Sequence, residues 1–549
     1  MAESARTPDR TRARWLGALA VALAFFAAYV GLTSELPIDD TARFTPSVAA
    51  LRCEWDPAHL FMQPATVLWQ RWLSFGSDAL VSQHLINATS AGIALGILWM
   101  LLGELGAARV RRVALILLAG FSFDVLVLAT SGHMKLTVMP FLCLGLRAAA
   151  LWERDLAVGG QPSRRRLIEC GAWLGVATTF LVSSVLLVPC AALAVLWARV
   201  RMKQGLRRGV REGFVLGLTA AATIVALFLA TYLVVGTNQR SLAGFLEFAR
   251  GSQASGRGGP TSGVLESLSR LAYGVGLAFV YLGDLGSILR AKMSGALPSL
   301  AGYSREIVWP LIAWTLIGSG LVALFVTTLL RLTRRGARGS IFGLCALAQI
   351  AGTLAFAFVW NLTEAEFYFP IVAPLTLLAV MLPRKRALDA VIIAASVLVV
   401  GTNLGSWALP RREYPLVRYG AELAKQLGPH DLLVGFQDYP GGPCLEFLLP
   451  ALPGASAVEV DELTLHAPDA EAALSSLDQR IRAALQSGGR VLVLRIFDEH
   501  DWNAPWPVLR MKGIDKARLR TFVEQRWQIT EHTPIAEIPT WELTTRAPR

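Results

Sequence analysis

Two adjacent carboxylates, Asp39 and Asp40, follow the first apolar run of the chain in the stretch ELPIDDTARF. Neighbouring carboxylates at a membrane boundary repel each other and lose solvation. Both effects raise the pKa of one of them, which suits that group to act as a general base. The alternative is an ordinary acidic loop or a helix cap. The residue types alone leave both interpretations open.

A short polar stretch, TSGHMK, places His133 and Lys135 between two apolar runs. A cation in a short outer loop runs against the usual excess of positive charge on the cytoplasmic side, and it could bind a lipid-linked phosphate. The alternative is a side chain that snorkels to the membrane interface. A later polar region carries Arg250 and Arg257 beside the Gly/Ser-rich stretch GSQASGRGGPTSG, which is typical of a substrate lid or a plain loop.

Three further polar residues lie close to predicted membrane boundaries. His59 lies in CEWDPAHLFMQPATVLWQRW, whose aromatic and Leu spacing predicts amphipathic helices along the outer membrane surface. An aromatic belt is the alternative for that pattern. Glu366 and Tyr368 lie in WNLTEAEFYFP between two apolar runs. Such residues are costly at that depth unless they face a cavity.

The composition is that of a polytopic membrane protein. Of the 549 residues, 54% are hydrophobic and only 17% are charged, and the mean hydropathy is +0.48. Soluble domains carry about 25% charged residues, so this composition excludes a disordered chain and argues against an ordinary soluble enzyme. The net charge of +12 needs no nucleic acid, because Arg clusters in short loops between apolar runs fix membrane topology. The six Cys residues form no CxxC pair and no zinc spacing, so no metal site is predicted.

The apolar runs and the basic loops predict about eleven transmembrane helices, with the N-terminus inside and the C-terminus outside. A cleaved signal peptide is the alternative for the first run, and the many later spans favour a retained helix. The block 170–200 is long enough for a hairpin of two short helices that turns near Ser183 and Ser184. The run 271–288 is expected to be interfacial or re-entrant. The other predicted spans cover 15–32, 85–102, 113–130, 136–152, 213–236, 307–330, 341–360, 367–382 and 387–406.

These spans divide the chain into a membrane part and a polar tail. Residues 1–14 are expected in the cytoplasm, and 15–406 form the transmembrane domain. That domain includes a first outer loop, 34–83, and a large outer loop, 237–305. Residues 407–549 lack a span and contain the short β-type runs DLLVGF and RVLVLRIF on either side of a helical pattern. We expect a small α/β domain on the outer, periplasmic face.

This arrangement resembles the GT-C membrane glycosyltransferases, among them the protein O-mannosyltransferases (glycosyltransferase family 39) and the lipid A aminoarabinose transferases. The resemblance lies in the first span followed by an acidic pair and an amphipathic outer loop. It extends to the hairpin-like block GAWLGVATTFLVSSVLLVPCAAL and to the late segment EAEFYFPIVAPLTLL. It covers about residues 13 to 406.

The resemblance implies a sugar transfer from a polyprenyl-phosphate donor to an extracytoplasmic lipid, glycan or protein, with inversion. It implies that Asp39 or Asp40 is the general base. It also implies donor-phosphate contacts from His133, Lys135 and Arg of the large loop. The remaining implied substrate contacts are His59, Glu366 and Tyr368.

Members of this group differ in whether they use a divalent ion, and the sequence requires no cofactor. The alternatives are a transporter or flippase, a protein like the O-antigen ligases and polymerases, and an inactive GT-C-like scaffold. The Arg- and Ala-rich composition is typical of bacteria, which predicts a multi-pass protein of the inner membrane. Membrane lipids are the other expected partners.

Overall fold

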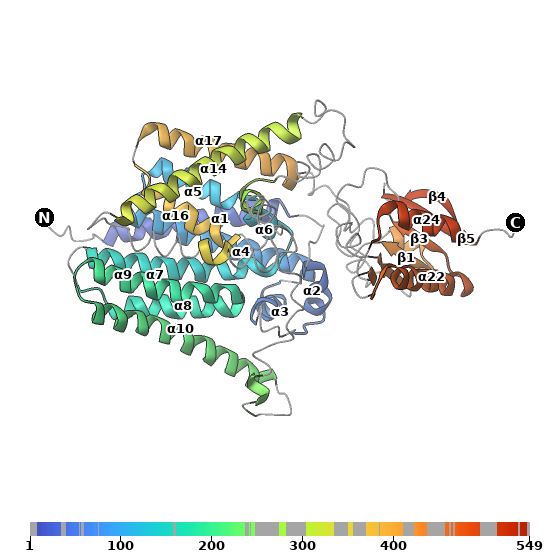
Figure 1. Ribbon diagram of the computed structural model, residues 1–549, viewed down its shortest axis with the longest axis horizontal. Helices are drawn as coiled ribbons and strands as arrows, with labels where there is room; N and C mark the ends of the chain where they lie inside the picture. The colour runs from blue at the N-terminus through green and yellow to red at the C-terminus, as the bar shows by residue number, and fades with distance from the viewer. Residues whose placement is uncertain are drawn as a thin grey trace.

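The protein is described from a computed structural model, which shows a bundle of long helices and a small α/β unit (Figure 1). The described residues are 8–33, 40–53, 55, 60–74, 76–157, 161–235, 241, 243–246, 274–281, 304–333, 350–354, 369–383, 385–409, 422–435, 456–460, 463–464, 467–494, 513–535 and 538–545. The bundle helices are α1 (Pro8–Gly31), α2 (Asp40–Ala49), α3 (Met62–Leu73), α4 (Ala79–Glu104), α5 (Arg109–Gly120), α6 (Phe123–Thr130), α7 (Met139–Ala157), α8 (Arg164–Phe180), α9 (Leu187–Arg201), α10 (Leu206–Val235), α14 (Ser304–Thr333), α16 (Phe369–Leu378) and α17 (Arg386–Asn403).

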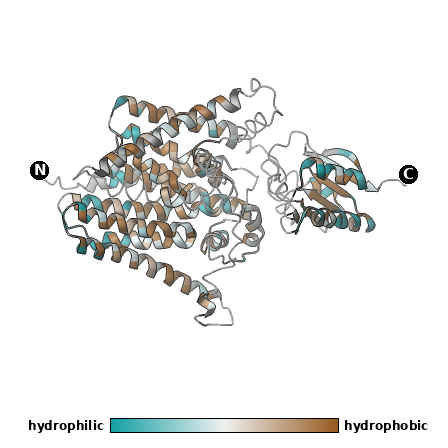
Figure 2. Cartoon of the chain, viewed as in Figure 1, coloured by the Kyte–Doolittle hydropathy of each residue, from teal (hydrophilic) through white to brown (hydrophobic). Residues whose placement is uncertain are grey.

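Six helices within the described residues are long and apolar enough to cross a membrane, and a seventh span results if the bent pair α5 and α6 counts as one. Hydrophobic residues run along the bundle helices, whereas hydrophilic ones are more frequent in the α/β unit (Figure 2). The chain is therefore a helical membrane protein. The expected count of about eleven spans stays a prediction, because several of those runs lie wholly or partly outside the described residues.

Small residues set the close packing of the first helices. A Cβ added at Gly92 of α4 would lie 2.6 Å from the Ala22 carbonyl oxygen of α1, and one at Gly96 would lie 2.8 Å from the Ala18 carbonyl oxygen. The two backbones can approach this closely because both positions are glycine. The Tyr29 hydroxyl then donates a 2.6 Å hydrogen bond to the Gly120 carbonyl, which joins α1 to the end of α5.

The run predicted as one span over 113–130 is broken. Helices α5 and α6 meet at an angle of 57°. Asn403 of α17 stabilises the break, because its side-chain amide donates to the Phe121 carbonyl at 2.7 Å and to the Phe279 carbonyl at 2.8 Å. Its amide oxygen accepts from the Tyr281 backbone N–H at 2.8 Å. One buried side chain thus joins three segments that are far apart in sequence.

The same contacts locate part of the run 271–288. Among its described residues, Ala278, Phe279 and Val280 are buried in the bundle core. These residues therefore pack against helices and do not lie at a lipid interface.

The block 170–200, predicted as a pair of short helices, is divided between two helices. Helix α8 ends at Phe180, a short 3₁₀ segment covers Val182–Leu186, and α9 follows. The break contains the predicted turn residues Ser183 and Ser184. Glycines on α8 and α10 allow α10 to pack closely on both helices, and the buried Arg199 of α9 forms a bidentate ion pair with Glu212 of α10 at 2.6 Å.

The sheet of the α/β unit has the order β2-β1-β3-β5-β4. Strand β1 pairs in parallel with β2 and β3, and β5 pairs antiparallel with β3 and β4. Helix α22 (Ala470–Gln486) packs one apolar face on the sheet, and its N-cap Asp469 accepts from the Ala472 N–H at 2.8 Å. The predicted strands DLLVGF and RVLVLRIF are confirmed as β1 and β3. The element bounds are β1 (Leu432–Gly435), β2 (Ser456–Glu459), β3 (Val491–Leu494), α24 (Lys516–Arg526), β4 (Trp527–Ile535) and β5 (Ile538–Thr545).

Candidate functional site

A stripe of buried polar side chains occupies the first turns of α4. Gln83, His84 and Asn87 are all buried, although α4 is otherwise an apolar helix. Leaving a buried polar atom without a hydrogen bond costs about 1–3 kcal/mol, so such a stripe requires either a network or a ligand. This stripe marks one end of the bundle as the candidate site.

Helix α2, which begins at Asp40, is joined to this stripe. The Gln83 side-chain amide donates to the Thr45 hydroxyl at 2.9 Å, and that hydroxyl donates to the Thr41 carbonyl at 2.6 Å. The second residue of α2 is thereby held beside α4. Thr41, which follows Asp40 in the sequence, is consequently part of the buried cluster.

The TSGHMK loop forms the other side of the cluster. The His84 ring makes a hydrogen bond with the Ser131 backbone. Gly132 has a φ of +78°, and a Cβ added there would lie 2.9 Å from the His84 Cδ2 atom and 3.0 Å from the Thr41 Cγ2 atom. Both the backbone conformation and the close contact require glycine. Thr41, His84 and Gly132 therefore meet at one point.

His133 and Lys135 follow directly, and both side chains are buried. Lys135 lies in a 3₁₀ segment, Met134–Val138, that leads into α7. Burial of both side chains is contrary to the alternative that they snorkel to a membrane interface. The structure thus places two of the predicted phosphate-binding residues beside the helix that begins at Asp40.

Four atoms of the cluster have no hydrogen-bond partner among the described residues. They are the Thr41 hydroxyl oxygen, the Gln83 and Asn87 side-chain amide oxygens and the Nε2 atom of His84. The sequence analysis did not select these residues. The signal that could have found them is the spacing of SQHLIN at the start of an apolar run, because positions i, i+1 and i+4 share one helix face.

The other predicted site residues are not placed by the structure. Asp40 begins α2, but its side chain is not described. The remaining six predicted site residues lie outside the described residues: Asp39, His59, Arg250, Arg257, Glu366 and Tyr368. Among the residues that are described, no three His, Cys, Asp or Glu side chains group as metal ligands would.

Helix α3 is amphipathic, as its aromatic spacing predicted. Met62, Thr66 and Val67 are buried, whereas Leu68 and Trp72 on the other face are exposed. Exposed apolar side chains at this end of the bundle fit a helix that lies along a membrane surface, which stays a prediction.

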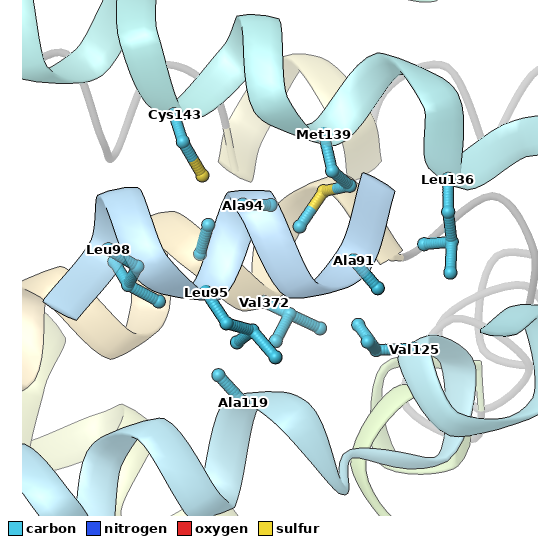
Figure 3. Close-up of a pocket in the computed structure, with 11 residues that line it drawn as sticks. Ala91, Ala94, Leu95, Leu98, Ala119, Val125, Leu136, Met139, Cys143 and Val372 are labelled. Carbon is cyan, nitrogen blue, oxygen red and sulfur yellow. The ribbon is translucent and has the colours of Figure 1, made fainter. Parts of the chain in front are cut away.

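An apolar pocket lies deeper in the bundle between α4, α5, α6, α7 and α16 (Figure 3). It begins at Ala91, one turn beyond Asn87, and its lining includes Leu136, Met139 and Val372. Cys143 contributes a thiol and Met139 a thioether, and the other lining side chains are hydrocarbon. A polar ligand needs polar partners, which the cluster on α4 offers and this pocket does not, so the polar cluster is the candidate site.

The similarities to known proteins come from solved structures. No protein-family model and no curated protein matches the sequence. The oligosaccharyltransferase of Archaeoglobus fulgidus in its apo form is 10% identical, with a TM-score of 0.50 over 97% of this chain and 74% of that one. ArnT from Cupriavidus metallidurans bound to undecaprenyl phosphate is 15% identical, with a TM-score of 0.42 over 96% of this chain and 97% of that one. The likeness to the oligosaccharyltransferase shows a GT-C fold, as the sequence resemblance implied.

Proposed function

We propose that the chain is a membrane glycosyltransferase that moves a sugar from a polyprenyl-phosphate donor to an acceptor outside the cytoplasm. The observation that supports this function is the meeting of Thr41, His84 and Gly132. Through that contact, the helix that begins at Asp40 and the loop that carries His133 and Lys135 lie together. A general base and a phosphate-binding cation are the two groups that this transfer needs most.

The proposed reaction is a single displacement. The acceptor hydroxyl or amine loses its proton to Asp39 or Asp40 and forms a bond with the anomeric carbon. The bond from that carbon to the phosphate oxygen breaks, and the configuration at the carbon inverts. The electron pair leaves with the polyprenyl phosphate, whose charge is stabilised by His133 and Lys135.

Residues outside the described part complete the proposed site. Arg250 and Arg257 are proposed to contact the donor phosphate. His59, Glu366 and Tyr368 are proposed to contact the sugar or the acceptor. These roles derive from the sequence resemblance, and the GT-C fold is consistent with them.

The orientation is proposed on charge grounds. The basic N-terminus, 1–14, would lie in the cytoplasm, and 15–406 would form the transmembrane domain in the inner membrane of a bacterium. Residues 407–549 would lie in the periplasm. In Figure 1 the sheet lies beyond the end of the bundle that carries α2 and α3, which is consistent with one common outer side.

The function is tested by reconstituting the purified protein in nanodiscs with a panel of polyprenyl-phosphate hexoses and pentoses. The expected result is release of polyprenyl phosphate from at least one donor in the presence of a glycan, lipid or protein acceptor. A product of inverted anomeric configuration would support the single displacement. A product of retained configuration would contradict it.

A further inference from the structure

We infer that His84 contacts the substrate directly, with its Nε2 atom accepting a hydrogen bond from a hydroxyl group of the transferred sugar. This inference builds on the proposed function and assigns part of the same site to the neutral sugar, separately from its phosphate.

The ring is held at one nitrogen and open at the other. Nε2 is buried and has no hydrogen-bond partner among the described residues, so the bond to the Ser131 backbone comes from Nδ1. A ring nitrogen that faces a backbone carbonyl carries the proton, so in the neutral ring Nε2 is a lone-pair acceptor. His84 thus offers an oriented acceptor in a protein interior.

Three other buried atoms of the cluster have a similar character. The Gln83 and Asn87 amide oxygens are acceptors, and the Thr41 hydroxyl can accept or donate; all three lack a partner in the described part of the chain. One N–H of each amide is already used, because Gln83 donates to Thr45 and Asn87 donates to the Gln83 carbonyl at 3.0 Å. The atoms that lack a partner in the described residues are three lone-pair acceptors and one hydroxyl.

Such a group selects the chemistry of its ligand. Lone pairs repel an anion, so this part of the site does not suit the phosphate. They match hydroxyl donors, which a sugar presents on several carbons. Lys135, three residues beyond Gly132 and also buried, supplies the complementary positive charge for the phosphate. The cluster therefore separates the sugar from its leaving group.

Two substitutions separate a direct contact of His84 with the sugar from a purely structural role of the ring. His84→Asn retains an amide N–H near the position of Nδ1 and removes the Nε2 acceptor. His84→Phe removes both. His430→Asn, at an exposed position of the α/β unit, is the matched control. Binding of bare undecaprenyl phosphate and of undecaprenyl phosphates carrying a hexose or a pentose is measured for each protein in nanodiscs.

The wild-type protein and the control should bind one sugar-bearing lipid more tightly than the bare lipid. His84→Asn should weaken that binding about tenfold, equal to about 1.4 kcal/mol, and leave the bare lipid unchanged. Equal affinity of the wild type and His84→Asn for the sugar-bearing lipid would overturn the inference and leave a buried water as the Nε2 partner. Equal binding of bare and sugar-bearing lipids by the wild type would also overturn it. Failure of the proposed function is seen separately, as a wild-type protein that binds donor but releases no polyprenyl phosphate.

Discussion

Gly132 lies against His84 so closely that a Cβ on residue 132 would come within 2.9 Å of the His84 Cδ2 atom. The contact joins a loop to the start of a long buried helix, and Thr41 of α2 touches the same glycine. It connects α4, α2 and the loop that carries His133 and Lys135.

The first prediction concerns this contact. Gly132→Ala should destabilise the protein by about 1–3 kcal/mol more than Gly76→Ala does. Both glycines have positive φ, +78° and +82°, but nothing lies within 4 Å of a Cβ at Gly76. The difference in thermal unfolding midpoint therefore isolates the clash. Equal effects of the two substitutions would mean that no close contact exists.

The second prediction concerns the buried ion pair between α9 and α10. Glu212→Gln leaves the buried Arg199 guanidinium without its carboxylate, which should cost about 3–5 kcal/mol. Glu169→Gln is the control, because Glu169 pairs with Arg165, whose side chain is 84% exposed. The control should cost at most about 1 kcal/mol. Unfolding of both variants in one detergent gives the comparison, and comparable losses would contradict the burial of Arg199.

The third prediction concerns Asn403. Asn403→Leu removes bonds to two carbonyls and one N–H at the broken helix pair, so the variant should lose at least about 2 kcal/mol of stability. Ser396 lies on the same helix as Asn403, and its hydroxyl donates to the Ala114 carbonyl of α5. Ser396→Ala removes this bond and should cost about 1 kcal/mol. An Asn403→Leu variant as stable as the wild type would contradict the conclusion that Asn403 stabilises the break between α5 and α6.

Long apolar runs were the part of the fold that the sequence predicted well. Helices α1, α4 and α10 coincide with predicted spans, because about 20 consecutive apolar residues are the length of helix that crosses a bilayer. Two of the five strands of the α/β unit, β1 and β3, were found for a similar reason, since LLVG and VLVL are short, buried and rich in β-branched or aliphatic residues, whereas β2, β4 and β5 were not predicted. Hydropathy could not find the break between α5 and α6, because it depends on an Asn that lies 282 residues from Phe121.

For the candidate site, the sequence pointed to His133 and Lys135 by charge, and the structure buries both in the loop whose Gly132 contacts Thr41 of α2. Their phosphate-binding role stays a prediction. The sequence missed His84, which lies just before the predicted span 85–102, because two features appear only in the folded chain: its contact with Gly132 and an Nε2 atom that lacks a partner within the described residues. Acidic residues after a span can be recognised in a sequence, but buried atoms without partners appear only after the chain is folded.

The fourth prediction concerns pH and the α/β unit. Burial raises the pKa of Asp431, but hydrogen bonds from the Arg490 and Gly428 backbone N–H groups and from the Arg490 guanidinium outweigh it and leave that pKa lowered. The folded-state pKa of Asp431 lies below its unfolded-state pKa, so the ionised carboxylate stabilises the folded unit. This stabilisation is complete above about pH 4 and is lost as the pH falls through the folded-state pKa.

Amide hydrogen exchange of the β1 and β3 peptides checks this prediction. At pH 6, Asp431→Asn should exchange faster than the wild type, and the difference should shrink as the pH falls below about 4. A difference that grows on acidification would contradict the sign of the pKa shift.

The general base gives the most direct test of the proposed function. The measurement is the rate of polyprenyl-phosphate release by the wild type, Asp39→Asn, Asp40→Asn and the control Glu35→Gln, which alters a third carboxylate of the same loop. One Asp variant should be slower by about a hundredfold or more, while the control and the folding of all variants stay unchanged. Wild-type rates in both Asp variants would contradict the assignment of this loop as the catalytic site.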